Sequence, residues 1–158
     1  MTTRPLVVFD CNIFLQAMLN GRGPAAECFA RCDRGDLGLV LSPIVLAEVR
    51  ALPYHPDLKR LLSLTPDRVD AFLAHALTHA LLLHNAPSVF VRPRDPDDEH
   101  YVNLAIAAGA SLIVSRDNDL LDLMNPQKPE GHDFLARFAH LRILPPTDLL
   151  SLLDRRIQ

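Results

Sequence analysis

The chain has 158 residues, of which 49% are hydrophobic and 22% charged, and its formal net charge is −3. A chain of this length and hydrophobicity can bury a substantial core, so the sequence predicts one folded domain over 1–158 and argues against a disordered protein. Because the net charge is not positive, nucleic-acid binding would have to come from a local group of basic residues.

The cysteines and the first residues indicate the cellular compartment. Cys11, Cys28 and Cys32 make an odd number, and the sequence opens without a charged and then apolar leader. No apolar run approaches the roughly 20 residues that a membrane span needs. We therefore expect reduced thiols and a cytoplasmic protein that does not contact a membrane.

Hydrophobic patterning predicts strands that alternate with helices along the chain. The predicted strands are short and mainly apolar, as in sheets covered on both faces, and they comprise residues 6–9, 37–41, 89–91, 112–114 and 141–144. The longer predicted helices between and after them cover residues 24–34, 66–83, 98–108, 133–140 and 148–156. This alternation predicts an α/β fold with three layers, α/β/α, around a central five-stranded parallel sheet.

Acidic residues stand where the predicted strands end. Asp10 follows the first strand, Asp117 and Asp119 follow the fourth, and Asp98 starts the helix after the third. Ligands of open parallel sheets bind beyond the carboxyl ends of the strands. The sequence therefore predicts that these carboxylates gather at one edge of the sheet.

Glu48 is the most informative single residue, because it lies inside a predicted helix among apolar neighbours. One turn away on either side stand Ile44, Val45, Ala51 and Leu52. This spacing predicts that Glu48 is on the inward face of the helix. A buried carboxylate is costly unless it is paired or binds a metal.

Gathered carboxylates repel one another strongly unless a cation neutralises them. Oxygen ligands without cysteine or histidine favour Mg²⁺ or Mn²⁺ over zinc. Such an ion can lower the pKa of a bound water and stabilise charge on a phosphoryl oxygen, as phosphodiester hydrolysis requires. Each aspartate alone could be only a helix cap or a turn former, so this prediction depends on their joint arrangement.

Four blocks of the sequence resemble PIN-domain ribonucleases, and more narrowly the VapC-like toxin components of bacterial toxin–antitoxin pairs. They are residues 7–14, which contain Asp10-Cys11-Asn12, the segment from 39 to Glu48, and residues 94–110 and 112–121. The resemblance implies the three-layer PIN-like fold, dependence on Mg²⁺ or Mn²⁺, single-stranded RNA as the substrate, frequent homodimers and a cognate antitoxin.

The same resemblance assigns residue roles. The acidic metal-binding and catalytic positions of the family are matched by Asp10, Glu48, Asp98 and Asp117. Supporting positions around them are matched by Asn12, Ser115 and Asp119. Cys11 and Ser115 replace threonines that are usual in the family, and neither change removes a metal ligand.

Arginines near the acids in sequence are candidates for holding the RNA backbone, although a solvated surface position is an equal interpretation for each. These residues are Arg50, Arg92, Arg94 and Arg116.

The leading hypothesis is a metal-dependent endoribonuclease that hydrolyses phosphodiester bonds of single-stranded RNA as the toxin of a toxin–antitoxin pair. The alternative is a catalytically weak PIN-fold protein that acts as a binding or regulatory module. A phosphoacceptor receiver domain would need a lysine after the last strand, and no lysine follows Lys128. A haloacid-dehalogenase-type phosphatase would need Asp-x-Asp after the first strand, where Asn12 stands instead.

Overall fold

The computed structural model describes residues 3–92 and 96–157. Its strands are β1 (Leu6–Phe9), β2 (Gly38–Leu41), β3 (Leu81–Leu82), β4 (Leu112–Val114) and β5 (Arg142–Leu144). The α-helices are α1 (Cys11–Leu19), α2 (Pro24–Asp33), α3 (Pro43–Ala51), α4 (Pro66–Leu77), α5 (Glu99–Ala108), α6 (Asn118–Leu121), α7 (Pro129–Arg137) and α8 (Pro146–Ile157). Short 3-10 turns are η1 (Leu52–Tyr54), η2 (Pro96–Asp98) and η3 (Asp122–Met124). In the part of the chain that is described, none of these helices has the length and apolarity to cross a bilayer.

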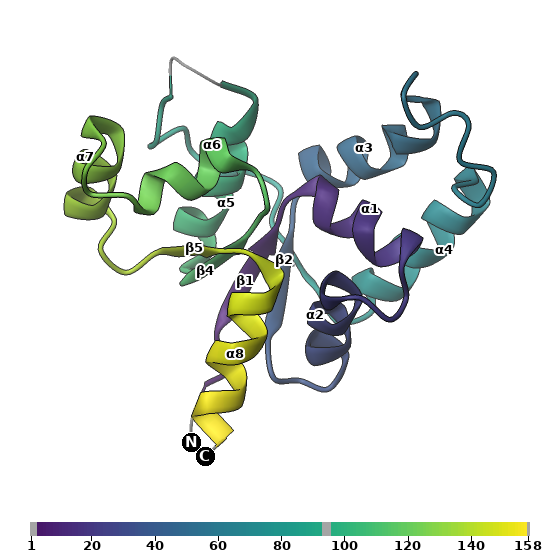
Figure 1. The fold of residues 1–158 in the computed structure, drawn as a ribbon, viewed down its shortest axis with the longest axis horizontal. Helices are drawn as coiled ribbons and strands as arrows, with labels where there is room; N and C mark the ends of the chain where they lie inside the picture. The colour runs from purple at the N-terminus through teal and green to yellow at the C-terminus, as the bar shows by residue number, and fades with distance from the viewer. Residues whose placement is uncertain (1–2, 93–95, 158) are drawn as a thin grey trace.

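The five strands form one parallel sheet in the order β3-β2-β1-β4-β5. This confirms the predicted α/β architecture. Helix α5 packs against β1, β2 and β4, while α8 packs on α2 and crosses in front of the sheet (Figure 1). Both chain ends lie at the amino edge of β1, so its opposite, carboxyl edge carries the loops that follow the strands (Figure 1).

The central strands are buried because helices cover both of their faces. All residues of β2 and β4 are buried, and Val8, Phe9 and Ile113 are fully shielded from solvent. On the α2 side, Phe9 meets the ring of Phe29 edge to face, with centroids 4.8 Å apart. A strand buried on both faces needs apolar residues at every position, which explains the continuous apolar runs in the sequence.

The helices that follow the strands begin at polar caps. The Ser42 hydroxyl accepts a hydrogen bond from Val45 N at the start of α3 (3.2 Å), and Pro43 occupies the first helical position. These are favoured residues at both positions, because they satisfy or remove the unpaired N–H groups of a helix start. The C-terminal end of α5 is closed by Gly109, whose φ is +69°. A residue with a Cβ adopts this left-handed conformation only at an energetic cost.

The prediction of the third strand is wrong. The strand that pairs with β2 is Leu81–Leu82, which sequence patterning assigned to the end of a helix over 66–83; that helix, α4, ends at Leu77. Residues 89–91 belong to no strand. A two-residue strand is too short to show a period of its own, so patterning could not separate it from the helix before it.

Residues 89 and 90 satisfy their backbone through a side chain instead of a neighbouring strand. Asn103, buried on α5, accepts hydrogen bonds at Oδ1 from Val89 N (3.0 Å) and Phe90 N (2.7 Å), and donates from Nδ2 to Phe90 O (3.0 Å). The amide thus reproduces the donors and acceptors that a sheet would supply. It ties the segment that leads towards Asp98 to the helix that Asp98 precedes.

Replacing Asn103 by alanine should therefore destabilise the fold, because the buried N–H and C=O groups of Phe90 lose their hydrogen-bond partner. We expect the free energy of unfolding to fall by about 2 kcal/mol or more, measured by urea denaturation. Asn20→Ala is the control: Asn20 is exposed and its side-chain oxygen accepts only an exposed hydrogen bond from Arg22 N. Equal losses in the two variants would contradict this role for Asn103.

Candidate metal centre

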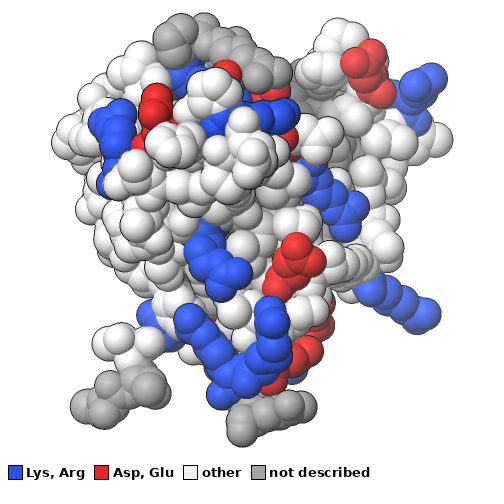
Figure 2. Space-filling model, turned by 60° about the vertical axis from the view of Figure 1, so that its left-hand side comes forward, with Lys and Arg blue, Asp and Glu red and all other residues white. Residues whose placement is uncertain are grey.

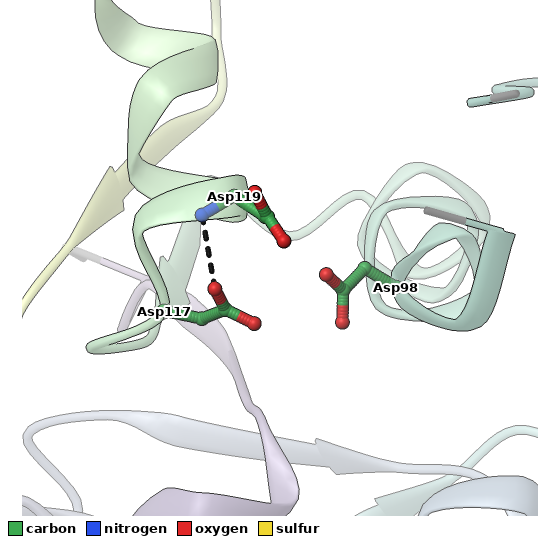
Figure 3. A group of neighbouring side chains, drawn as sticks. All are labelled: Asp98, Asp117 and Asp119. Atoms are coloured by element: carbon green, nitrogen blue, oxygen red, sulfur yellow. Dashed lines mark hydrogen bonds between the residues drawn. The ribbon is translucent and has the colours of Figure 1, made fainter. Parts of the chain in front are cut away.

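Three aspartates gather at the carboxyl edge of the sheet. Asp98 ends η2 and precedes α5, whereas Asp117 and Asp119 stand at the start of α6, after β4. One oxygen of each carboxylate lies within 4.8 Å of the others, and all three residues are half-buried. Figure 3 shows the Asp98 carboxylate facing those of Asp117 and Asp119 across a gap between the two elements.

The turn after β4 fixes Asp117 and Asp119 relative to each other. Asp117 Oδ1 accepts a hydrogen bond from Asp119 N (2.9 Å), which is the dashed line in Figure 3, and so caps α6. The Asp117 N–H in turn donates to Ser115 Oγ (2.9 Å). Both carboxylates are therefore presented by a tightly hydrogen-bonded turn, as aspartates in such turns typically are.

Asp10 lies beside this group but deeper in the protein. It is only 3% exposed, its Oδ1 accepts from Ile13 N (3.2 Å), and its Oδ2 accepts from the Ser115 hydroxyl. The pKa of Asp10 is raised from 3.8 to about 6, mainly by burial and to a smaller extent by the negative charge of Asp117; the hydrogen bonds from Ser115 and the backbone oppose this rise. Ser115 thus joins Asp10 to the Asp117 turn.

Glu48 lies at the border of the core rather than on a fully inward face. Val45 and Leu52 are buried, but Ile44 is 54% exposed and Ala51 is also exposed. The side chain of Glu48 itself retains 33% of its exposure. The apolar neighbours in sequence were misleading, because the helix α3 leaves part of its apolar surface open to solvent.

Two residues of α5 contact the Glu48 carboxylate. The Tyr101 hydroxyl donates to Glu48 Oε1 (3.1 Å) and accepts from Cys11 N (3.0 Å). His100 Nε2 lies 2.6 Å from the same Glu48 oxygen, at ion-pair distance but without hydrogen-bond alignment. Burial is the main cause that raises the pKa of the Tyr101 phenol, so this group is a neutral hydrogen-bond donor at ordinary pH.

The structure therefore divides the sequence-predicted acids into two sets. Among the described residues, the compact group contains Asp98, Asp117 and Asp119, and neither Asp10 nor Glu48 belongs to it. Asp10 reaches this group through Ser115, and Glu48 is linked to the first turn of α1 through Tyr101. Asn12 is exposed on that same turn.

The four arginines expected near the acids have different environments. Arg92 is 3% exposed: its guanidinium contacts Glu130 Oε2 (2.9 Å) and the carbonyl of Asp119. It is an internal clamp on the Asp119 turn, and it is not placed to hold a phosphate, contrary to the sequence-based expectation. Arg50 and Arg116 are exposed, and Arg50 lies 3.9 Å from Asp70. Arg94 lies outside the described residues.

Sequence reasoning missed the residues that hold the acids in place. Tyr101 lies within the predicted helix over 98–108, and nothing in its position in the sequence indicated that its hydroxyl meets Glu48. Asn103 sits among apolar neighbours on α5, which is an unusual place for an amide. A buried amide or arginine normally has specific partners, so Asn103 was the one signal that a closer reading could have used.

The described basic residues gather mainly at one end of the face drawn in Figure 2. Figure 2 shows one face on which basic and acidic side chains are interspersed, with the largest group of Lys and Arg at the end where the termini lie. A cavity of about 510 Å³ near the termini is lined in part by Arg4, Arg31 and Arg156. This end is opposite to the edge that carries the aspartates.

The raised pKa of Asp10 predicts a specific pH dependence of stability when divalent cations are removed with EDTA. A carboxyl group that binds its proton more tightly in the folded state stabilises the fold below about pH 4, and this contribution is lost as the pH rises through about 6. The free energy of unfolding of the wild type minus that of Asp10→Asn should fall by about 3 kcal/mol across this window. Asp133→Asn, at an 82% exposed side chain, is the control, and a flat difference for Asp10→Asn would contradict the prediction.

Comparisons with known proteins identify the family and the fold of the chain. The PIN-domain family model matches residues 6–119. The uncharacterized protein MJ1680 of Methanocaldococcus jannaschii is 24% identical over 96% of this chain and 93% of its own. Two solved structures share the fold. One is PAE2754 of Pyrobaculum aerophilum (TM-score 0.56, 16% identity, 97% of this chain and 91% of that one). The other is VapBC2 of Rickettsia felis, bound to a DNA fragment from its promoter (TM-score 0.51, 12% identity, 87% of this chain and 96% of that one). The chain belongs to the PIN-domain family.

Proposed function

We propose that this protein is a divalent-metal-dependent endoribonuclease that hydrolyses phosphodiester bonds of single-stranded RNA, and that it is the toxin of a toxin–antitoxin pair. The observation that carries the proposal is the approach of Asp98, Asp117 and Asp119 to within 4.8 Å of one another. Members of the PIN-domain family, to which the chain belongs, are generally nucleases.

The donor set of this group fits Mg²⁺ or Mn²⁺. Its ligand atoms are carboxylate oxygens only, which hard cations prefer. Three negative charges at this separation repel one another in a partly buried site, and a bound cation would offset that repulsion. A cation bound there supplies a lowered pKa for a bound water and stabilises charge on a phosphoryl oxygen.

In this proposal the remaining acids support the centre from two sides. Asp10 adds negative charge next to Asp117 and is held by Ser115. The Oε1 atom of Glu48 contacts Tyr101 and His100, so Oε2 is the atom that would contact a bound cation or accept a proton from the attacking water.

The RNA and protein partners follow from the surface and the family. The exposed Arg50 and Arg116 are the described arginines of the predicted set that can contact phosphates. The fold shared with VapBC2 supports a cognate antitoxin as partner, and the resemblance to VapC toxins supports a homodimer.

The direct test is cleavage of a labelled single-stranded RNA with Mn²⁺ or Mg²⁺. Asp98→Asn should reduce the cleavage rate at least about 100-fold, because it removes a charge from the cation-binding group. Asp97→Asn is a matched control, since Asp97 is the adjacent acid, is exposed, and is not part of that group. Equal rates for wild type and Asp98→Asn would remove the assignment.

Calorimetric titration with Mn²⁺ separates the enzyme from the alternative, a binding module with little turnover. We expect saturable binding below millimolar metal in the wild type, and at least about tenfold weaker binding in Asp117→Asn, because one carboxylate charge is lost. An absence of binding at millimolar Mn²⁺ in the wild type would favour the module.

A further inference from the structure

We infer that Tyr101 is a positioning residue for Glu48: its hydroxyl group fixes the Glu48 carboxylate against the turn that carries Asp10. This inference rests on the proposed function, because it assigns Glu48 a place in that site. The inference goes beyond the proposed function, because it names the group on which the orientation of Glu48 depends.

One phenol oxygen connects elements that carry three of the acids. Tyr101 lies on α5, directly after the turn with Asp98, and is 3% exposed. Its oxygen contacts Cys11 N, next to Asp10, at 3.0 Å and Glu48 Oε1 on α3 at 3.1 Å. Close packing restricts the movement of a buried aromatic ring, so the hydroxyl oxygen of Tyr101 holds a defined position for both contacts.

The direction of each hydrogen bond follows from the donors present. The backbone N–H of Cys11 can only donate, so the phenol oxygen is the acceptor there. The single hydrogen of the hydroxyl group is then directed to Glu48 Oε1. The hydroxyl thus has one donor and one acceptor role, and both are used.

Because Tyr101 holds Oε1 of Glu48, Oε2 is left to contact a cation or a water molecule. Oε1 of Glu48 receives the Tyr101 hydroxyl and faces His100 Nε2 at 2.6 Å. The described residues offer Oε2 no hydrogen bond or ion pair. Donors that act on the far oxygen of a metal-site carboxylate typically set its orientation, and their loss weakens metal binding or activity by about 10–100-fold.

Tyr101→Phe tests the inference, because it removes the hydroxyl and keeps the ring. We expect the Mn²⁺ dissociation constant to rise, or kcat for RNA cleavage to fall at unchanged KM, by about tenfold. The effect should disappear when Glu48 is already Gln, since Tyr101 then has no carboxylate to orient. Thr65→Ala is a stability control: it removes the cap of α4, where Thr65 Oγ1 accepts from Arg68 N, and should change neither quantity.

Tyrosine fluorescence gives a second readout that does not depend on turnover or on the folding of Tyr101→Phe. The chain has two tyrosines and no tryptophan, so Tyr54→Phe, at a residue 64% exposed, leaves Tyr101 as the sole emitter. Mg²⁺ should change its emission in Tyr54→Phe and should not do so when Glu48→Gln is added.

The outcomes separate the two proposals. If the wild type binds Mn²⁺ and cleaves RNA while Tyr101→Phe matches it in both, or while the Tyr101→Phe and Glu48→Gln effects simply multiply, the positioning role is wrong and the nuclease assignment stands. If the wild type neither binds the metal nor cleaves RNA, both are overturned. A loss in Tyr101→Phe that vanishes beside Glu48→Gln supports the positioning role.

Discussion

The mutual repulsion of Asp98, Asp117 and Asp119 is the constraint on which the rest of this structure depends. Their oxygens approach within 4.8 Å at a half-buried edge of the sheet, where solvent screens charge less than it does on an open surface. Hydrogen bonds in the turn after β4 hold Asp117 and Asp119 in place. In the proposed function, a bound cation would offset the repulsion that remains between the three carboxylates.

The holding contacts come from elements far apart along the chain. Ser115 joins Asp10 to the turn after β4, and the buried guanidinium of Arg92 grips the carbonyl of Asp119. Tyr101 ties Glu48 to the first turn of α1. None of these three residues is an acid, and each makes a hydrogen bond that points an acid or its turn in one direction. The arrangement resembles the supporting contacts around known metal sites, where ligand orientation depends on such neighbours.

The sequence was sufficient for the parts of the fold that repeat a pattern. Continuous apolar runs predicted β1, β2, β4 and β5, and the polar residues after them predicted which edge would carry the acids. The sequence failed for β3, because a strand of two residues shows no hydrophobic period. It wrongly placed a strand at Val89 and Phe90, whose backbone groups bind the amide of Asn103 instead of a neighbouring strand. It misplaced Arg92 and Glu48 for a related reason: whether a charged side chain is buried depends on tertiary contacts that no local spacing encodes. Asp119, expected only in support, lies in the compact group with Asp98 and Asp117.

The most direct measurement is a crystal structure of the protein grown with Mn²⁺, with anomalous scattering data recorded to locate the ion. A peak between the carboxylates of Asp98, Asp117 and Asp119, in contact with oxygens from both sides of the gap, is the predicted result. Crystals that contain Mn²⁺ but show no peak there, with these carboxylates drawn apart, would contradict a cation as the reason for their approach.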